Sequence, residues 1–124
     1  MGDRTLLEMA AKSAGVDVHE SDDGTIQCRP ILAVYHYVQG QPYSEHEWNP
    51  LREDADCARM EVACRIGINW FDARVTASVE DAEGDQIECS ESFANGHNNH
   101  DPNAARRRAS TRAAAALEQG KQNG

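Results

Sequence analysis

Arginines gather near the end of the chain, in a segment with helical spacing. A guanidinium group presents a planar fork of N–H donors that matches phosphate oxygens, so this cluster could contact nucleic acid or another phosphate. The other interpretation is a helix face that pairs with carboxylates of the same chain. We favour it, because no aromatic interleaving or helix-turn-helix pattern accompanies the cluster. The candidate phosphate-contacting residues are Arg106, Arg107, Arg108 and Arg112.

Acidic residues form the opposite kind of cluster, in a stretch with hairpin spacing. A solvated hairpin explains them. The functional alternative is a contact surface for a partner protein, in which carboxylates imitate a nucleic-acid backbone and occupy the partner's phosphate-binding groove. The candidate partner-contacting residues are Glu80, Asp81, Glu83, Asp85, Glu88 and Glu91.

The charge is divided unevenly along the chain, whose net charge is −9. Residues 1–101 hold 7 Lys and Arg against 20 Asp and Glu, which gives −13. Residues 102–124 hold 5 against Glu118 alone, which gives +4. Such a distribution bears on the partner and not on the fold. An acidic body repels a duplex, so nucleic-acid binding by the C-terminal helix stands as the alternative function.

Two histidines raise the question of a metal. His97 and His100 lie three positions apart, followed by Asp101, and imidazoles at that spacing can share a transition metal. A closed zinc site needs about four ligands. No clear fourth ligand lies nearby in the sequence, so we expect no metal.

Cysteines are the other candidates for chemistry, at positions 28, 57, 64 and 89. None forms a Cys-x-x-Cys pair, and we expect free, partly buried thiols. The chain has no Gly-x-Ser-x-Gly, no His-Glu-x-x-His, no Walker-type loop and no Gly-x-Gly-x-x-Gly. We therefore expect no catalytic residue and no cofactor. A metal- or thiol-dependent enzyme that uses His97, His100 and the cysteines is a further functional hypothesis, from a different class of protein.

The length of 124 residues suits one domain. We expect it to span residues 1–118, with a flexible tail at 119–124. The aromatic part of the core is expected to be Trp48, Trp70, Phe71 and Phe93. Mean hydropathy is −0.70, and no apolar run approaches the roughly 20 residues that span a bilayer. The first residues lack the basic and then apolar pattern of a secretory signal peptide. We therefore expect a soluble cytoplasmic protein that contacts no membrane.

The first third predicts a helix over residues 3–14, capped by Asp3 and ended by Gly15. Its apolar stripe is Leu6, Leu7, Ala10, Ala11 and Ala14. Alternating and β-rich segments then predict strands at 16–19, 25–28 and 31–38, with a turn at 22–24.

The middle of the chain predicts a helix that begins at Pro50, with Asn49 as its N-cap, and ends at Gly67. Apolar residues lie on both sides of this helix, which indicates packing on two sides. One face holds Leu51, Ala55, Ala58, Val62 and Ile66, and the other holds Cys57, Met60 and Cys64.

The last third predicts a strand over 68–79, a polar turn at 81–85 and a return strand that begins near Ile87. Asp101 and Pro102 then begin a helix that runs to about residue 117. The element order predicts an α+β fold. We expect a small mixed or antiparallel sheet of four to five strands, covered by two to three helices.

Three blocks of sequence resemble small uncharacterised proteins of tailed phages and prophages. The blocks are the opening residues 3–12, the helix start Trp48-Asn49-Pro50-Leu51 running on to Ile68, and the alanine- and arginine-rich stretch 101–115. Those proteins are similar to a phage domain described as an α-β-α sandwich. This chain departs from them at Cys57 and Cys64, where leucine or alanine is usual, and residues 16–47 fit no pattern of the family.

The resemblance implies a phage accessory protein made inside the host, and it carries over no activity and no catalytic residue. Our first functional hypothesis is a non-enzymatic protein that acts through contact with a host or phage protein. By analogy with other small acidic phage proteins, that contact could antagonise host defence.

Overall fold

The computed structural model describes residues 2–20, 26–28 and 46–123, and it confirms an α+β protein. The expected turn at 22–24 and strand at 31–38 lie outside the described residues, as does the side chain of Cys28. The helices are α1 (Asp3–Ala14), α2 (Asp54–Cys64), the short 3-10 helix η2 (His97–His100) and α3 (Pro102–Asn123). The strands are β1 (Val18–Glu20), β2 (Ile26–Cys28), β3 (His46–Glu47), β4 (Gly67–Trp70), β5 (Arg74–Glu80) and β6 (Gln86–Ser92).

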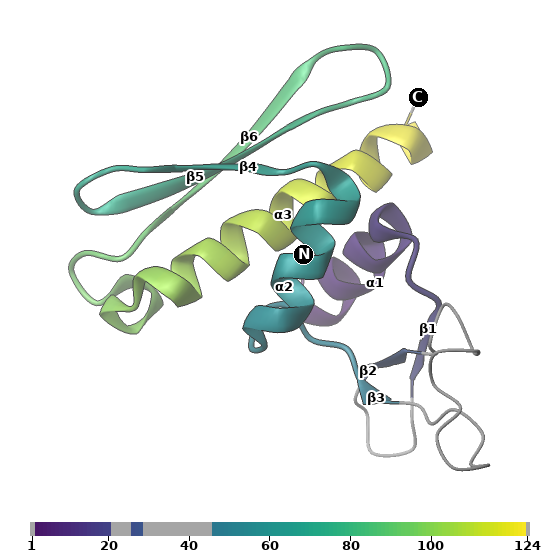
Figure 1. The fold of residues 1–124 in the computed structure, drawn as a ribbon, viewed down its shortest axis with the longest axis horizontal. Coiled ribbons are helices and arrows are strands. Elements are labelled where there is room, and N and C mark those ends of the chain that lie inside the picture. Colours follow the sequence, from purple (N-terminus) through teal and green to yellow (C-terminus); the bar gives the residue numbers. More distant parts are fainter. Residues whose placement is uncertain (1, 21–25, 29–45, 124) are drawn as a thin grey trace.

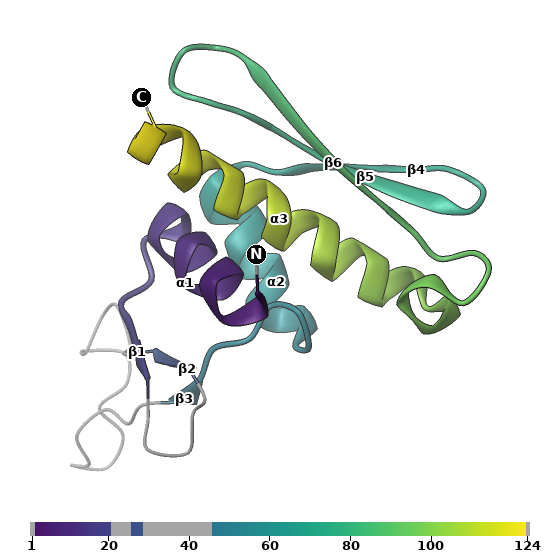
Figure 2. The same cartoon turned by 180° about the vertical axis from the view of Figure 1, so that it is seen from behind.

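The strands form two separate antiparallel sheets within the described residues, in the orders β1-β2-β3 and β4-β5-β6. The expected single sheet of four to five strands is therefore wrong. The predicted strand over 68–79 is in fact two strands, because the chain turns back at residues 71–73, where the N–H of Phe71 donates to the carbonyl of Arg74 at 2.8 Å. The two sheets lie on opposite sides of the helices (Figures 1 and 2).

Helix α3 lies at the centre of the fold. It crosses one face of the β4-β5-β6 sheet, while α1 and α2 lie on its other side (Figure 1). Its alanines face both layers: Ala105, Ala109 and Ala113 are fully buried in the cluster that holds the sheet residues, and Ala114 and Ala115 are buried with α1. Small side chains on two faces let the helix backbone approach both layers closely.

Helix α1 has the expected bounds and the expected buried residues Leu6, Leu7, Ala10 and Ala11. Gly15 ends it with φ +74°, a left-handed conformation that suits glycine. The expected cap is wrong, because Gly2 occupies the N-cap position without a side-chain bond. Asp3 lies in the first turn, and its carboxylate accepts hydrogen bonds from Arg108 instead.

Helix α2 begins at Asp54, four residues later than expected. Its expected end at Gly67 is also wrong, because the helix ends at Cys64, where Arg65 takes the left-handed conformation with φ +59°, and Gly67 begins β4. The Asn49 side chain does not cap it but accepts from the N–H of Leu51 at 3.1 Å, in a turn that precedes the helix. The N–H of Asn49 donates to Asp56 at 3.0 Å, which holds that carboxylate inside.

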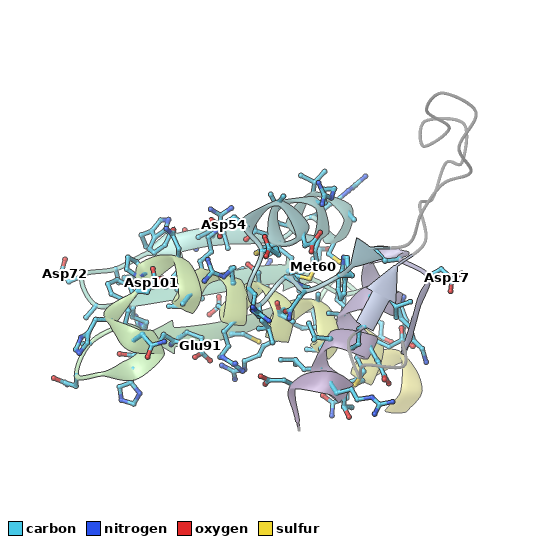
Figure 3. All side chains as sticks on the ribbon, turned by 90° about the horizontal axis from the view of Figure 1, so that it is seen from below. Asp17, Asp54, Met60, Asp72, Glu91 and Asp101 are labelled. Atoms are coloured by element: carbon cyan, nitrogen blue, oxygen red, sulfur yellow. The ribbon has the colours of Figure 1, made fainter. Side chains whose placement is uncertain are left out.

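The face of α2 that packs is one of the two that the sequence offers. The helix buries Asp56, Cys57, Met60 and Glu61, and Met60 lies between α2 and the helices beneath it (Figure 3). The other face is exposed at Ala55, Ala58 and Val62, whose exposed fraction is 79%. Packing of α2 on two sides is therefore wrong for the described residues.

The C-terminal third follows the expected plan more closely. Strands β5 and β6 pair from Arg74 with Ser92 to Glu80 with Gln86, and Gly84 in the turn has φ +87°. Asp101 starts α3, because its carboxylate accepts from the N–H of Asn103 at 2.9 Å. The helix continues through Asn123, so the segment expected to be a tail at 119–124 is helical over its described part.

We predict that Ala109→Leu destabilises the protein by about 1–3 kcal/mol, because the added atoms overpack the contact between α3 and the sheet. The matched control is Ala58→Leu on the exposed face of α2, expected to change the free energy of unfolding by less than about 0.5 kcal/mol. Denaturant unfolding measures both. Equal losses in the two variants would contradict the assignment of buried and exposed faces.

Candidate functional site

Each arginine of the cluster on α3 binds a carboxylate of the same chain. Their partners lie in three different parts of the fold. This is the arrangement described by the interpretation that we favoured, in which the helix face pairs with carboxylates of the same chain. All four candidates for phosphate contact therefore have a carboxylate partner within the chain. The pairs are Arg106 with Glu61 at 2.5 Å, Arg107 with Asp54 at 2.7 Å, Arg108 with Asp3 at 3.2 Å, and Arg112 with Glu91.

The pair between α2 and α3 is the most buried. The side chain of Glu61 is only 7% exposed. It accepts two hydrogen bonds from Arg106 and a third, at 2.5 Å, from the hydroxyl of the fully buried Ser110. A carboxylate removed from water needs such partners to remain charged. This cluster therefore has a structural role, and Ser110 is no accessible nucleophile.

The pair at the edge of the sheet protects a strand. Arg112 donates to the carbonyl of Ser90 at 3.1 Å while it binds Glu91. Asn98 donates to the next outward carbonyl, that of Ser92, at 2.7 Å. Both carbonyls belong to β6, an edge strand of its sheet. Bonds of this kind reduce the tendency of an open edge to pair with another chain.

The acidic hairpin separates into bound and free carboxylates. Glu91 is held by Arg112, and Asp81 accepts from the N–H groups of Glu83 and Asp85 at 2.9 and 2.8 Å, which shapes the turn. The remaining carboxylates are exposed and have no side-chain partner within the described part of the chain. They are Glu80, Glu83, Asp85 and Glu88.

Among the described residues, the one group of three metal-ligating side chains is Asp81, Glu83 and Asp85, with ligand atoms within 4.8 Å of one another. Carboxylate oxygens suit Ca²⁺ or Mg²⁺. The backbone bonds of Asp81 already explain why the three lie close together. His97 and His100 are exposed on η2 and belong to no such group in the described residues.

The described cysteines are free thiols in environments that disfavour the thiolate. Burial, followed by the charge of Glu61, raises the pKa of Cys57 to about 12. Burial also raises the pKa of Cys64 and of Cys89. Nucleophilic cysteines have a lowered pKa, so these thiols favour packing over catalysis.

The aromatic core expected from the sequence is wrong at Trp70 and Phe71, which lie at the exposed β4–β5 turn. Trp70 and Phe71 are each 50% exposed, whereas Trp48 is buried as expected. Trp70 contacts Phe93 edge-on at 6.3 Å between ring centroids, and the guanidinium of Arg74 lies 4.5 Å from the centre of the Phe71 ring. The signal was the run Trp70-Phe71-Asp72, which breaks the alternation of a single strand.

Comparison of the chain with protein-family models, with curated proteins and with solved structures finds no match. The resemblance to phage proteins therefore stays a prediction. No helix in the described residues is both long enough and apolar enough to cross a membrane.

We predict that Arg106→Ala lowers the free energy of unfolding by about 2–3 kcal/mol, because it leaves Glu61 buried without its charged partner. The control is Arg108→Ala, expected to cost less than about 1 kcal/mol because its partner Asp3 is largely exposed. Urea unfolding distinguishes them. A loss from Arg108→Ala as large as that from Arg106→Ala would contradict a structural role specific to Glu61.

We predict that iodoacetamide alkylates Cys57 at pH 9 at least about 100-fold more slowly in the folded protein than in urea, since so little of the folded thiol is ionised. Peptide-resolved mass spectrometry measures the rate at this one position. Similar rates in the two states would show that the thiol is neither buried nor raised in pKa.

Proposed function

We propose that this chain is a non-enzymatic phage or prophage accessory protein that acts in the host cytoplasm by contact with another protein. The contact surface is the β5–β6 hairpin. The observation that supports it is the group of free carboxylates at Glu80, Glu83, Asp85 and Glu88 on one hairpin. Such a partner would present a basic surface.

The position of the hairpin supports this proposal. The turn between β5 and β6 extends beyond the body of α3 in both views (Figures 1 and 2). Carboxylates on a projecting element reach a partner's groove without a clash from the helices. Opposite charges on two surfaces speed diffusional encounter and fix orientation, an effect that salt weakens. Occupation of a partner's phosphate-binding groove is the form of contact that best fits carboxylates spaced along a hairpin.

The alternative function, nucleic-acid binding by α3, has less support. Arg106 and Arg112 are held by carboxylates that are 7% and 16% exposed. Release of these arginines to phosphate would leave buried charges unpaired, which costs several kcal/mol. Antagonism of host defence remains the proposed biological outcome of the protein contact.

We predict that the triple variant Glu83→Gln, Asp85→Asn, Glu88→Gln reduces capture of the partner from a bacterial host lysate by about tenfold at low salt, because steering and complementarity are lost. Immobilised protein with quantitative mass spectrometry of the bound proteins measures this. Capture by the unchanged protein should also fall as salt rises.

The matched control removes three exposed charges elsewhere, as Asp17→Asn, Glu53→Gln, Asp72→Asn. Asp17 and Asp72 lie toward opposite ends of the molecule (Figure 3). This control should capture the partner as well as the unchanged protein does. An equal loss of capture in both variants would show that the effect comes from net charge alone. Capture that survives in the hairpin variant would show that the hairpin is not the contact surface.

A further inference from the structure

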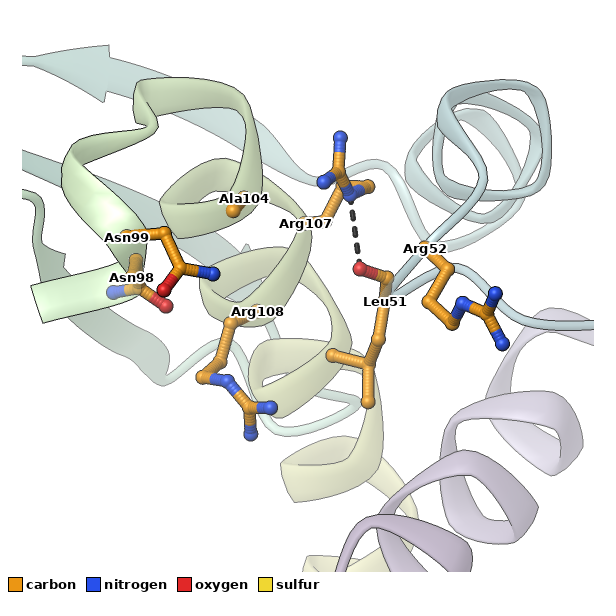
Figure 4. A pocket seen from close by; sticks show the side chains of 7 residues that line it. All are labelled: Leu51, Arg52, Asn98, Asn99, Ala104, Arg107 and Arg108. Carbon is orange, nitrogen blue, oxygen red and sulfur yellow. Dashed lines mark hydrogen bonds between the residues drawn. The ribbon is translucent and has the colours of Figure 1, made fainter.

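A polar pocket lies where the start of α3 meets the turn before α2. Its volume is about 390 Å³, and it is open to solvent. One wall is the η2 segment with Asn98 and Asn99, and the opposite wall is the turn that carries Leu51 and Arg52, with α3 between them (Figure 4). It is lined by Leu51, Arg52, Asn98, Asn99, Ala104, Arg107 and Arg108.

Three of the lining residues are arginines. Arg107 is 15% exposed and is fixed in place, because its Nε donates to the carbonyl of Leu51 at 2.9 Å (Figure 4). Arg108 extends below it, and Arg52 lies at the outer rim, beyond Leu51, with its guanidinium turned outward (Figure 4). Arg52 has no partner within the described residues. Three guanidinium groups around one pocket favour an anion there, although the protein as a whole is acidic.

The counter-ions of these arginines differ from those of the structural pairs. Asp54 is 75% exposed and Asp3 is 62% exposed, so each pair is weak and can exchange with water or a ligand. Arg106 and Arg112, by contrast, bind carboxylates that are mostly buried. The arginine cluster thus divides into two residues that hold the fold and two that can bind an anion.

The asparagine wall adds one neutral donor group, the amide of Asn99, because the amide N–H groups of Asn98 are bound to Ser92 and Glu91. Asn98 and Asn99 have φ of +51° and +56°, in the left-handed region. Asparagine tolerates this conformation better than other residues with a Cβ atom, yet it is sparsely populated. The η2 segment holds this left-handed conformation beside the pocket. The Asn99 amide points into the cavity between the two walls (Figure 4). An amide N–H is a donor for an oxygen that the guanidiniums also contact.

We propose that this pocket binds the phosphate group of a phosphorylated small molecule, with Arg107, Arg108 and the Asn99 amide as donors, and that the exposed Arg52 side chain turns inward from the rim when the ligand binds. The volume lies within the range of about 300–1,000 Å³ typical of small-molecule sites. The site lies at the N-terminal end of α3, whereas the acidic β5–β6 turn lies beside its C-terminal end (Figures 1 and 2). It is therefore independent of the proposed protein contact.

The test is calorimetric titration of the full chain at low salt with inorganic phosphate, with adenosine monophosphate, with adenosine and with a short oligonucleotide. We expect the two phosphate-bearing ligands to bind and adenosine not to bind. Tighter binding of the nucleotide would identify a phosphorylated small molecule as the source of the group. Equal binding would identify free phosphate as sufficient.

Two variants locate the site. Arg52→Gln with Arg108→Gln should weaken binding at least about tenfold, since two charge-assisted bonds are lost. Asn99→Gly keeps the left-handed backbone while it removes the amide, and should weaken binding about threefold. The control Arg65→Gln with Lys121→Gln removes the same charge from outside the pocket and should bind within about twofold of the unchanged protein.

Several results would overturn the proposal. These are no binding of either phosphate-bearing ligand at millimolar concentration, equal binding of adenosine, or an equal loss in the control and in the pocket variant. Binding of oligonucleotides alone would also overturn it and would point to an extended nucleic-acid surface. Circular dichroism of each variant shows whether its fold is kept, so a loss of binding in a folded variant is attributed to the pocket.

Discussion

The fold depends on the burial of α3 on two sides at once. A helix between a sheet and two other helices can present only small side chains where both layers approach it closely. In α3 these side chains are alanines, namely Ala105, Ala109 and Ala113 on one face and Ala114 on the other. Alanine contributes little apolar area, so hydrophobic burial alone gives a modest core. The bond between Arg106 and Glu61, supported by Ser110, supplements it by joining α3 to α2.

The same arrangement determines which charges remain for function. Pairing with α3 withdraws Glu61 and Glu91 from the acidic set and Arg106 and Arg112 from the basic set. Free carboxylates are left on the β5–β6 hairpin and weakly paired arginines at the other end of α3. One helix thus separates an acidic surface, proposed for a protein partner, from a basic pocket, proposed for a phosphate group.

Local signals were sufficient for α1, for the β5–β6 hairpin and for the start of α3. Gly15, Gly84 and Asp101 act through backbone conformation or hydrogen bonds to near neighbours, so their effect can be read from the sequence. The same reasoning failed at Asn49, because its side chain can cap a helix or stabilise a turn with equal local plausibility. Contact between its N–H and Asp56 selected the turn.

The sequence by itself determined the α+β class, the position of most elements, the acidic and basic clusters and the lack of recognised catalytic motifs. Tertiary structure alone decided which face of α2 is buried, which carboxylate binds each arginine, and that Asn99, Arg52 and Arg108 line one pocket. The physical reason is distance along the chain. Asp3 and Arg108 are 105 positions apart, and no local pattern encodes a contact that forms only when α1 packs on α3.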